Sequence, residues 1–119
     1  MNSVIEKIFK NFSVNGLAIP VSFVFYNGNA KTYITYSESN INDTLSADDE
    51  LINYVDYYDF DIYSKGNYLK VVESIIELME QNGWIWQPSQ SSSDLYDKDS
   101  GYYHKTLCFA KERSVNTNG

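Results

Sequence analysis

An alternating stretch that leads directly into an amphipathic segment constrains the fold of this chain most strongly. Residues 51–63 alternate with the period of a β-strand. One face of this strand carries Ile52, Tyr54, Tyr58, Phe60 and Ile62. Residues 67–81 place apolar side chains at helical spacing. The helical stripe contains Leu69, Val72, Ile75, Ile76 and Met79. Between them, Ser64-Lys65-Gly66-Asn67 has the composition of a sharp turn. The sequence therefore predicts a long strand, a turn and a helix that ends at Asn82-Gly83.

The first third of the chain predicts a short helix and a hairpin. Ser3 and Glu6 have the spacing of a capping box, and apolar residues recur at helical intervals over residues 3–12. Asn15-Gly16 is typical of a helix end. Residues 20–26 and 31–36 are rich in aromatic and β-branched side chains and flank a turn at residues 27–29. We therefore expect these two segments to form an antiparallel hairpin.

Further strands are predicted at residues 84–86 and 101–110, with a turn at residues 97–101. Asp56 interrupts the apolar face of the long strand, which predicts a bulge or a sheet edge there. The order of elements favours an α+β fold, in which two helices pack on a mostly antiparallel sheet of four to five strands. The chain length predicts one domain over residues 1–113. Residues 114–119 are polar and are expected to form a flexible C-terminal tail.

Composition argues against several functions. The net charge of −7 does not favour attraction to a phosphate backbone, so we expect no sequence-specific nucleic-acid binding. No apolar run approaches the ~20 residues of a membrane-spanning helix, and no basic amphipathic face favours a membrane surface. A single cysteine, Cys108, cannot form an internal disulfide, and no signal peptide is recognisable. These features predict a soluble protein made in the cytosol.

No catalytic constellation is visible, so we predict no enzymatic activity, no cofactor and no metal. Asp59 and Asp61 share a strand face but supply too few oxygen ligands for a calcium or magnesium site. His104 and Cys108 are four residues apart on a strand, about 13 Å at ~3.3 Å per residue, which is too far for a nucleophile and base pair. Glycine-rich phosphate-binding motifs are also missing from the sequence.

The run from Phe60 to Tyr68, which leads into a helix, resembles the tail terminator and tail completion proteins of long-tailed bacteriophages. Those proteins also carry a strand, a short Ile-aromatic-Ser-Lys/Arg-Gly turn and an amphipathic helix. An early helix and hairpin and a late strand at residues 102–110 follow in the same order. The similarity spans roughly residues 3–113, and its motif is a structural turn.

The resemblance implies a structural virion protein that caps the tail tube and joins it to the head. It implies a ring of identical subunits, commonly a hexamer, with the tail tube protein and a head-completion or connector protein as partners. The expected location is the host cytoplasm during assembly and then the neck end of the virion tail. Either role, terminator or joining protein, fits the resemblance.

The surface expected to make these contacts is a polar segment and the strand that follows it. Residues 37–47 are predicted to form a long loop, which ends in an acidic cluster. The predicted interface residues are Asp48, Asp49, Glu50, Tyr54, Tyr57 and Tyr58. The acidic charge also supports a second hypothesis, a small inhibitor or immunity-type protein that binds a basic partner. Such a protein would bind its target rapidly and with a strong dependence on salt.

Overall fold

The computed structural model describes residues 2–39, 43–46 and 52–115. Within these ranges the chain forms two α-helices, a short 3-10 helix and nine strands. In chain order they are α1 (Asn2–Ile8), β1 (Ser13–Val14), β2 (Leu17–Ala18), β3 (Val21–Phe23), β4 (Thr32–Glu38), β5 (Asp43–Ser46), β6 (Ile52–Ser64), α2 (Leu69–Gln81), β7 (Ile85–Trp86), η1 (Pro88–Gln90), β8 (Leu95–Asp97) and β9 (Tyr102–Val115).

Seven of these strands form one sheet, in which β3, β4, β6, β9 and β7 follow one another from edge to edge. β5 pairs with β6 beyond the end of β4, and β8 pairs with β9. β6 and β9 are antiparallel over their whole paired length, from Ile52 opposite Val115 to Ser64 opposite Tyr103. The α+β class and the mostly antiparallel sheet are thus confirmed. The predicted count of four to five strands is too low, because edge strands of only two to four residues carry little sequence signal.

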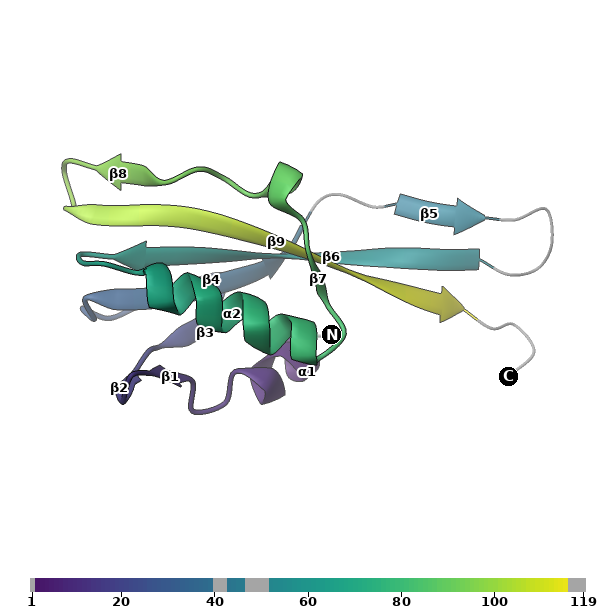
Figure 1. The fold of residues 1–119 in the computed structure, drawn as a ribbon, viewed down its shortest axis with the longest axis horizontal. Helices are drawn as coiled ribbons and strands as arrows, with labels where there is room; N and C mark the ends of the chain where they lie inside the picture. The colour runs from purple at the N-terminus through teal and green to yellow at the C-terminus, as the bar shows by residue number, and fades with distance from the viewer. Residues whose placement is uncertain (1, 40–42, 47–51, 116–119) are drawn as a thin grey trace.

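Both helices lie on one face of the sheet, and the core fills the space between them and β6 (Figure 1). The side chains of Phe60 and Ile62 in β6 are fully buried there. Ile75 from α2 joins the same cluster, and the ring of Phe9, just after α1, lies 5.1 Å from the ring of Phe60. Period-two alternation in β6 and helical spacing in α2 therefore meet at one shared core.

The sheet continues beyond the helices as a narrow ribbon (Figure 1). We call this ribbon the arm: it consists of β5, residues 52–55 of β6 and residues 112–115 of β9. The molecule measures 52 × 27 × 23 Å, and its radius of gyration is 16.0 Å. A compact chain of this length has a radius of gyration of about 13.5 Å. The arm thus places backbone outside the part of the sheet that the helices cover.

The predicted hairpin over residues 20–36 is wrong, because β3 pairs with β4 in parallel, with Val21 opposite Ile34. The chain leaves β3 at Val24, whose φ is +65°, and returns to the start of β4 before it pairs. Residues 27–29 therefore lie in a crossover connection and not in a hairpin turn. Composition alone does not distinguish these two connections.

The short helix is also smaller than predicted. α1 begins at Asn2, so Ser3 lies inside the helix and not at its cap, and α1 ends at Ile8. Asn15-Gly16 is the turn of a hairpin between β1 and β2, in which Val14 faces Leu17. Both turn residues have positive φ, 53° and 80°, as a two-residue hairpin turn of this kind requires. The Asn-Gly pair was therefore a hairpin signal and not a helix end.

Three further predictions along the long strands need correction. Residues 43–46, expected in a loop, form β5 because β6 is long enough to pair with it beyond β4. Asp56 causes no bulge, since it lies in continuous register opposite Lys111, but on its other side it lies between the residues that pair with β5 and those that pair with β4. Residues 114 and 115, expected in the flexible tail, belong to β9. The long strand, the α2 helix and the turn at residues 97–101 are confirmed.

Among the described residues, no helix has the length and apolar character needed to cross a membrane.

Candidate interaction surfaces

Two polar side chains, Ser64 and Asn67, stabilise the turn between β6 and α2. Both belong to the run from Phe60 to Tyr68 that resembles the tail proteins. Ser64 is buried, and its hydroxyl oxygen lies 2.8 Å from that of Thr32 on β4. The same oxygen accepts the backbone N–H of Gly66 at 3.2 Å. Asn67 then accepts the backbone N–H of Leu69 at 3.0 Å through Oδ1, which satisfies a free donor at the start of α2. This turn fixes where α2 begins.

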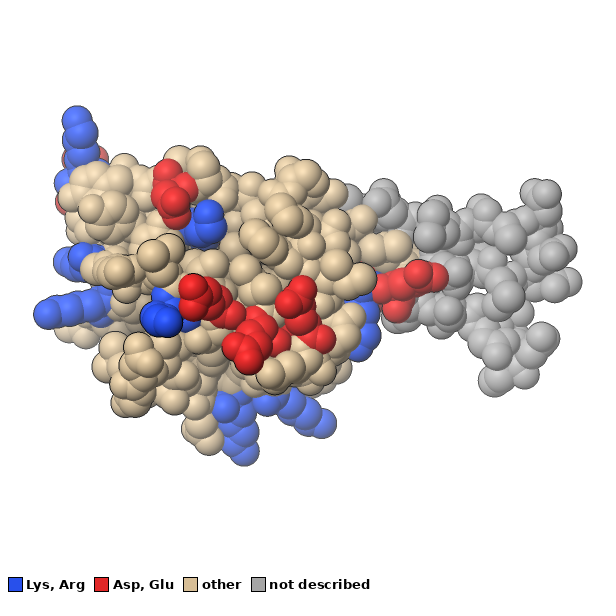
Figure 2. Space-filling model, viewed as in Figure 1, with Lys and Arg blue, Asp and Glu red and all other residues tan. Residues whose placement is uncertain are grey.

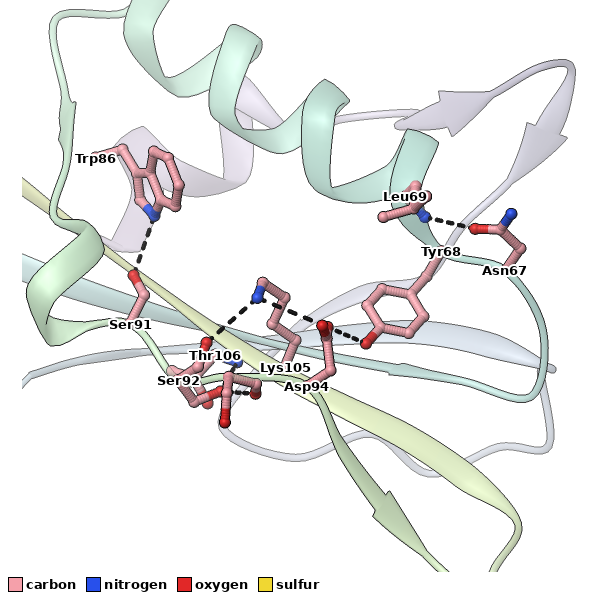
Figure 3. Close-up of polar contacts among 10 residues, drawn as sticks. Asn67, Tyr68, Leu69, Trp86, Ser91, Ser92, Asp94, Lys105 and Thr106 are labelled. Carbon is pink, nitrogen blue, oxygen red and sulfur yellow. Dashed lines mark hydrogen bonds and ion pairs between the residues drawn. The ribbon is translucent and has the colours of Figure 1, made fainter.

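A polar cluster faces this turn from the strand β9 and the segment before β8 (Figure 3). The Tyr68 hydroxyl donates a hydrogen bond to Oδ1 of Asp94. The Lys105 ammonium lies 3.6 Å from the same carboxylate oxygen and donates to the carbonyl of Ser92 at 3.3 Å. Burial raises the pKa of Tyr68 to about 12, and the bond to Asp94 adds to this effect. The same hydrogen bond, with the nearby Lys105, lowers the pKa of Asp94.

Beside this cluster lies an apolar pocket of about 540 Å³. We call it the α2 pocket; its lining residues are Lys65, Gly66, Asn67, Tyr68, Leu69, Asp94 and Tyr103. Leu69 and Tyr103 keep 64% and 41% of their surface exposed, although both are large and apolar. The ring of Tyr96 on β8 packs 4.8 Å from that of Tyr103 and extends the apolar wall. The pocket thus has apolar walls and a rim with one carboxylate and one lysine, an arrangement suited to an apolar side chain.

The Tyr68–Asp94 hydrogen bond makes a testable contribution to acid stability. The pKa of Asp94 is lowered in the folded state, so its contribution is present above the unfolded pKa and is lost as pH falls through the folded pKa. We expect Tyr68→Phe to raise the Asp94 pKa toward the ordinary aspartate value of 3.8 and to remove part of the stability loss below pH 4. NMR titration of the Asp94 side chain measures this shift. Tyr96→Phe is the matched control, and an unchanged Asp94 pKa in Tyr68→Phe would contradict the account.

A second apolar feature lies at the opposite edge of the sheet. Phe23, Val24 and Phe25 are consecutive and keep 45%, 60% and 71% of their surface exposed. We call them the β3 knob. The Phe25 backbone N–H donates to the carbonyl of Phe23 at 2.6 Å, which closes a three-residue γ-turn around Val24. A positive φ is a rare conformation for a β-branched residue, so the backbone here is strained.

The helix-free face of the sheet carries a ladder of stacked rings. Tyr26 stacks on Tyr33 at 4.5 Å, Tyr33 on Tyr63 at 4.8 Å, and Tyr63 on His104 at 4.4 Å. His104 also forms an ion pair with Asp61, 3.0 Å apart, when its ring is protonated. The ladder therefore joins the crossover connection to β4, β6 and β9. The rings of the ladder contact one another, so several of the chain's many tyrosines pack within the subunit.

Asp59 and Asp61 share this face of the sheet, as predicted, and both are half-buried. The Thr106 hydroxyl donates to Asp61 at 2.6 Å, and burial raises the pKa of Asp59. No group of three or more His, Cys, Asp or Glu side chains able to hold a metal occurs in the part of the chain that the structure describes. His104 and Cys108 interact with different aspartates, Asp61 and Asp59, and do not form a pair.

Cys108 is expected to be inert in the folded protein. Its side chain is buried, and this burial, with the nearby Asp59 carboxylate, raises its pKa to about 12. The thiolate is the reactive form of cysteine. We therefore expect no reaction with a thiol reagent at pH 8 under native conditions and full reaction in denaturant. Absorbance after addition of Ellman's reagent measures both; rapid labelling of the native protein would contradict the burial.

The structure gives different outcomes for the six residues that were predicted to form an interface. Asp48, Asp49 and Glu50 lie outside the described residues. Tyr54 is half-exposed and lies on the arm. Tyr58 is fully buried in the core and Tyr57 is buried on the other face, so neither can supply contact surface in this conformation. The interpretation of Tyr57 and Tyr58 as interface residues is therefore corrected, because both sides of β6 are covered at these positions.

Neither the β3 knob nor the α2 pocket was predicted from the sequence. Residues 20–26 have the composition of an ordinary strand, and only the positive φ of Val24 turns Phe25 out of the sheet. Asp94 and Tyr103 belong to segments that have no common motif. The sequence offered no signal for the pocket, since Leu69 follows the spacing of the apolar helical stripe although its side chain is exposed in the structure.

The outer face of α2 is acidic. Glu73, Glu77 and Glu80 are exposed on this helix, and Figure 2 shows carboxylate side chains gathered over the place that α2 occupies in Figure 1. Lys70 lies 3.8 Å from Glu73 and offsets part of the charge. Four surfaces can therefore contact a partner: this acidic stripe, the arm, the α2 pocket and the β3 knob.

In comparisons with known proteins, no family model and no curated protein matches the chain.

Proposed function

We propose that the chain is a structural tail protein of a long-tailed bacteriophage or prophage, which forms a ring that caps the tail tube and joins it to the head. The observation that carries the proposal is the arm. In a sheet domain, strands without a layer packed on them gain little from burial, so such a ribbon is best explained by contacts with other molecules. The helices α1 and α2 cover the other part of the sheet (Figure 1).

The edges of the sheet support the same proposal. β5 pairs only with β6, and β3 is a three-residue strand with β4 as its one partner, as far as the described residues show. Subunits can associate through their sheets where strand edges are unpaired and apolar side chains are exposed. A ring needs two different surfaces on each subunit that meet under rotation. The elongated subunit offers several surfaces that are far enough apart for this role.

The acidic stripe on α2 favours the second candidate, an inhibitor of a basic protein. Glu73, Glu77 and Glu80 lie on one helix face, and such a face would attract a basic surface over several ångströms. The two functions differ in stoichiometry. An inhibitor binds its target one to one, and its affinity falls steeply as salt is added. A tail protein binds copies of itself and the end of a tube.

The test uses purified protein and tail tubes from a phage mutant that lacks the gene. We expect gold-labelled protein to bind at one end of each tube, as seen by negative-stain electron microscopy. The triple variant Glu73→Gln, Glu77→Gln and Glu80→Gln serves as the control and is expected to bind equally well. Absence of the label from tube ends, together with salt-sensitive one-to-one binding to a basic host protein, would favour the inhibitor.

A further inference from the structure

Two exposed apolar features lie at opposite edges of the same sheet. The β3 knob is at the edge strand β3, and the α2 pocket lies beside β9, which pairs with β8. From β3 to β8 the sheet crosses four inter-strand spacings of about 4.8 Å, or roughly 19 Å. The knob therefore cannot reach the pocket of its own subunit by a local rearrangement. It can reach the pocket of another copy.

The β3 knob is built to stay exposed. A γ-turn around Val24 holds Phe25 at 71% exposure, and the backbone of Val24 is strained. Strain of this kind persists where the surrounding structure imposes it, commonly at binding sites. Phe23 anchors the turn, because its ring packs 5.5 Å from the ring of Tyr36 on β4. A rigidly presented aromatic side chain loses little conformational entropy on binding.

The α2 pocket has the complementary chemistry. Leu69 and Tyr103 form apolar walls that the subunit itself leaves half-covered. Asp94 on the rim of the pocket is already paired with Lys105, so an apolar side chain could enter without separating this carboxylate from its partner. The rim lysine, Lys65, holds its ammonium 4.9 Å from the centroid of the Tyr102 ring. Apolar centres with polar rims are the usual composition of protein interfaces. The pocket volume of about 540 Å³ is ample for an aromatic side chain.

We propose that Phe25, together with Val24, of one copy inserts into the α2 pocket of a second copy. The contact joins two different surfaces, so each subunit has a free knob at one side and a free pocket at the other. Such head-to-tail contacts close into a ring or continue as a filament, depending on the rotation between subunits. The inference names the subunit contact of the proposed ring; it depends on the proposed function only for the closure of that ring.

The test compares three single variants by sedimentation velocity, at concentrations up to the solubility limit. Phe25→Asp removes the knob, Leu69→Asp blocks the pocket, and Ile85→Asp, at an exposed apolar residue on β7, is the matched control. We expect the unmodified protein and Ile85→Asp to form species larger than a dimer. Phe25→Asp and Leu69→Asp should each weaken association by roughly thirtyfold or more, as for loss of a central aromatic anchor. Circular dichroism verifies that every variant is folded.

Mixing the two interface variants gives the sharpest result. Phe25→Asp keeps an intact pocket and Leu69→Asp keeps an intact knob, so a head-to-tail contact predicts a one-to-one heterodimer and nothing larger. The proposal is overturned if the unmodified protein is monomeric at every concentration, if either variant associates as the unmodified protein does, or if the mixture forms no heterodimer. Capping of tail tubes by Phe25→Asp would also reject this contact but leave the proposed function intact. Conversely, the expected heterodimer with no binding to tubes would retain the contact and reject the proposed function.

Discussion

Replacing Phe60 with Ala is expected to lower the free energy of unfolding by about 3–5 kcal/mol. Phe60 is fully buried at the centre of β6, where three aromatic rings surround it. Its ring centroid lies 5.1 Å from that of Phe9, 5.8 Å from Tyr36 and 5.6 Å from Phe109. The cavity left by alanine would be lined by side chains from the α1 region, β4 and β9, which cannot all move inward. Urea denaturation measures the loss.

The matched control for this variant is Phe25→Ala. It removes the same side chain from a position that is 71% exposed, so we expect a change within about 0.5 kcal/mol. Both variants replace phenylalanine with alanine, so the difference between their free energies of unfolding measures the effect of burial. A loss below about 1.5 kcal/mol for Phe60→Ala would mean that the helices are not packed on this face of β6 as described, since a filled core position costs more than that.

The second large effect is expected at the turn that carries the resemblance motif. Ser64→Ala should cost about 1–3 kcal/mol, because it removes the acceptor of the Gly66 N–H and the hydroxyl partner of Thr32 in a buried site. Thermal and urea unfolding measure this cost. Since the turn sets the start of α2, NMR shifts around Leu69 should also change.

Ser74→Ala is the control for Ser64→Ala. The Ser74 hydroxyl donates to the carbonyl of Lys70 within α2, in an exposed position. Bonds of this type add little to helix stability, and alanine is the better helix former, so the control should be neutral or slightly more stable. Equal effects of the two substitutions would show that the Ser64 network does not hold the turn.

The sequence predicted the centre of this fold well and its edges poorly, for physical reasons. β6 and α2 each bury one face against the same core, so their periods of 2 and 3.6 are visible in the residues. The parallel pairing of β3 with β4 depends on the backbone of Val24, a β-branched residue whose positive φ no composition rule anticipates. β5 and β8 are short edge strands, which exist because long partners extend past them.

The surfaces were harder to predict than the fold. Tyr57 and Tyr58 were assigned to an interface because they lie on the strand that follows the acidic segment, but an aromatic residue in a strand serves the core equally well. The α2 pocket combines Leu69, Asp94 and Tyr103, which are separated in sequence and meet only through the pairing of β8 with β9 and the position of α2. A site assembled in this way has no linear pattern, whereas the Ser64 turn, which is contiguous, could be predicted.

Deletion of the gene from its phage or prophage, followed by induction and negative-stain imaging of the particles, tests the central proposal most directly. We predict a tail defect. Overlong tails without heads would identify a terminator, and tails of normal length beside filled heads would identify a joining protein. Restoring the unmodified gene from a plasmid should restore whole virions. Intact, infectious particles from the deletion strain would contradict the proposal that the chain is a tail protein.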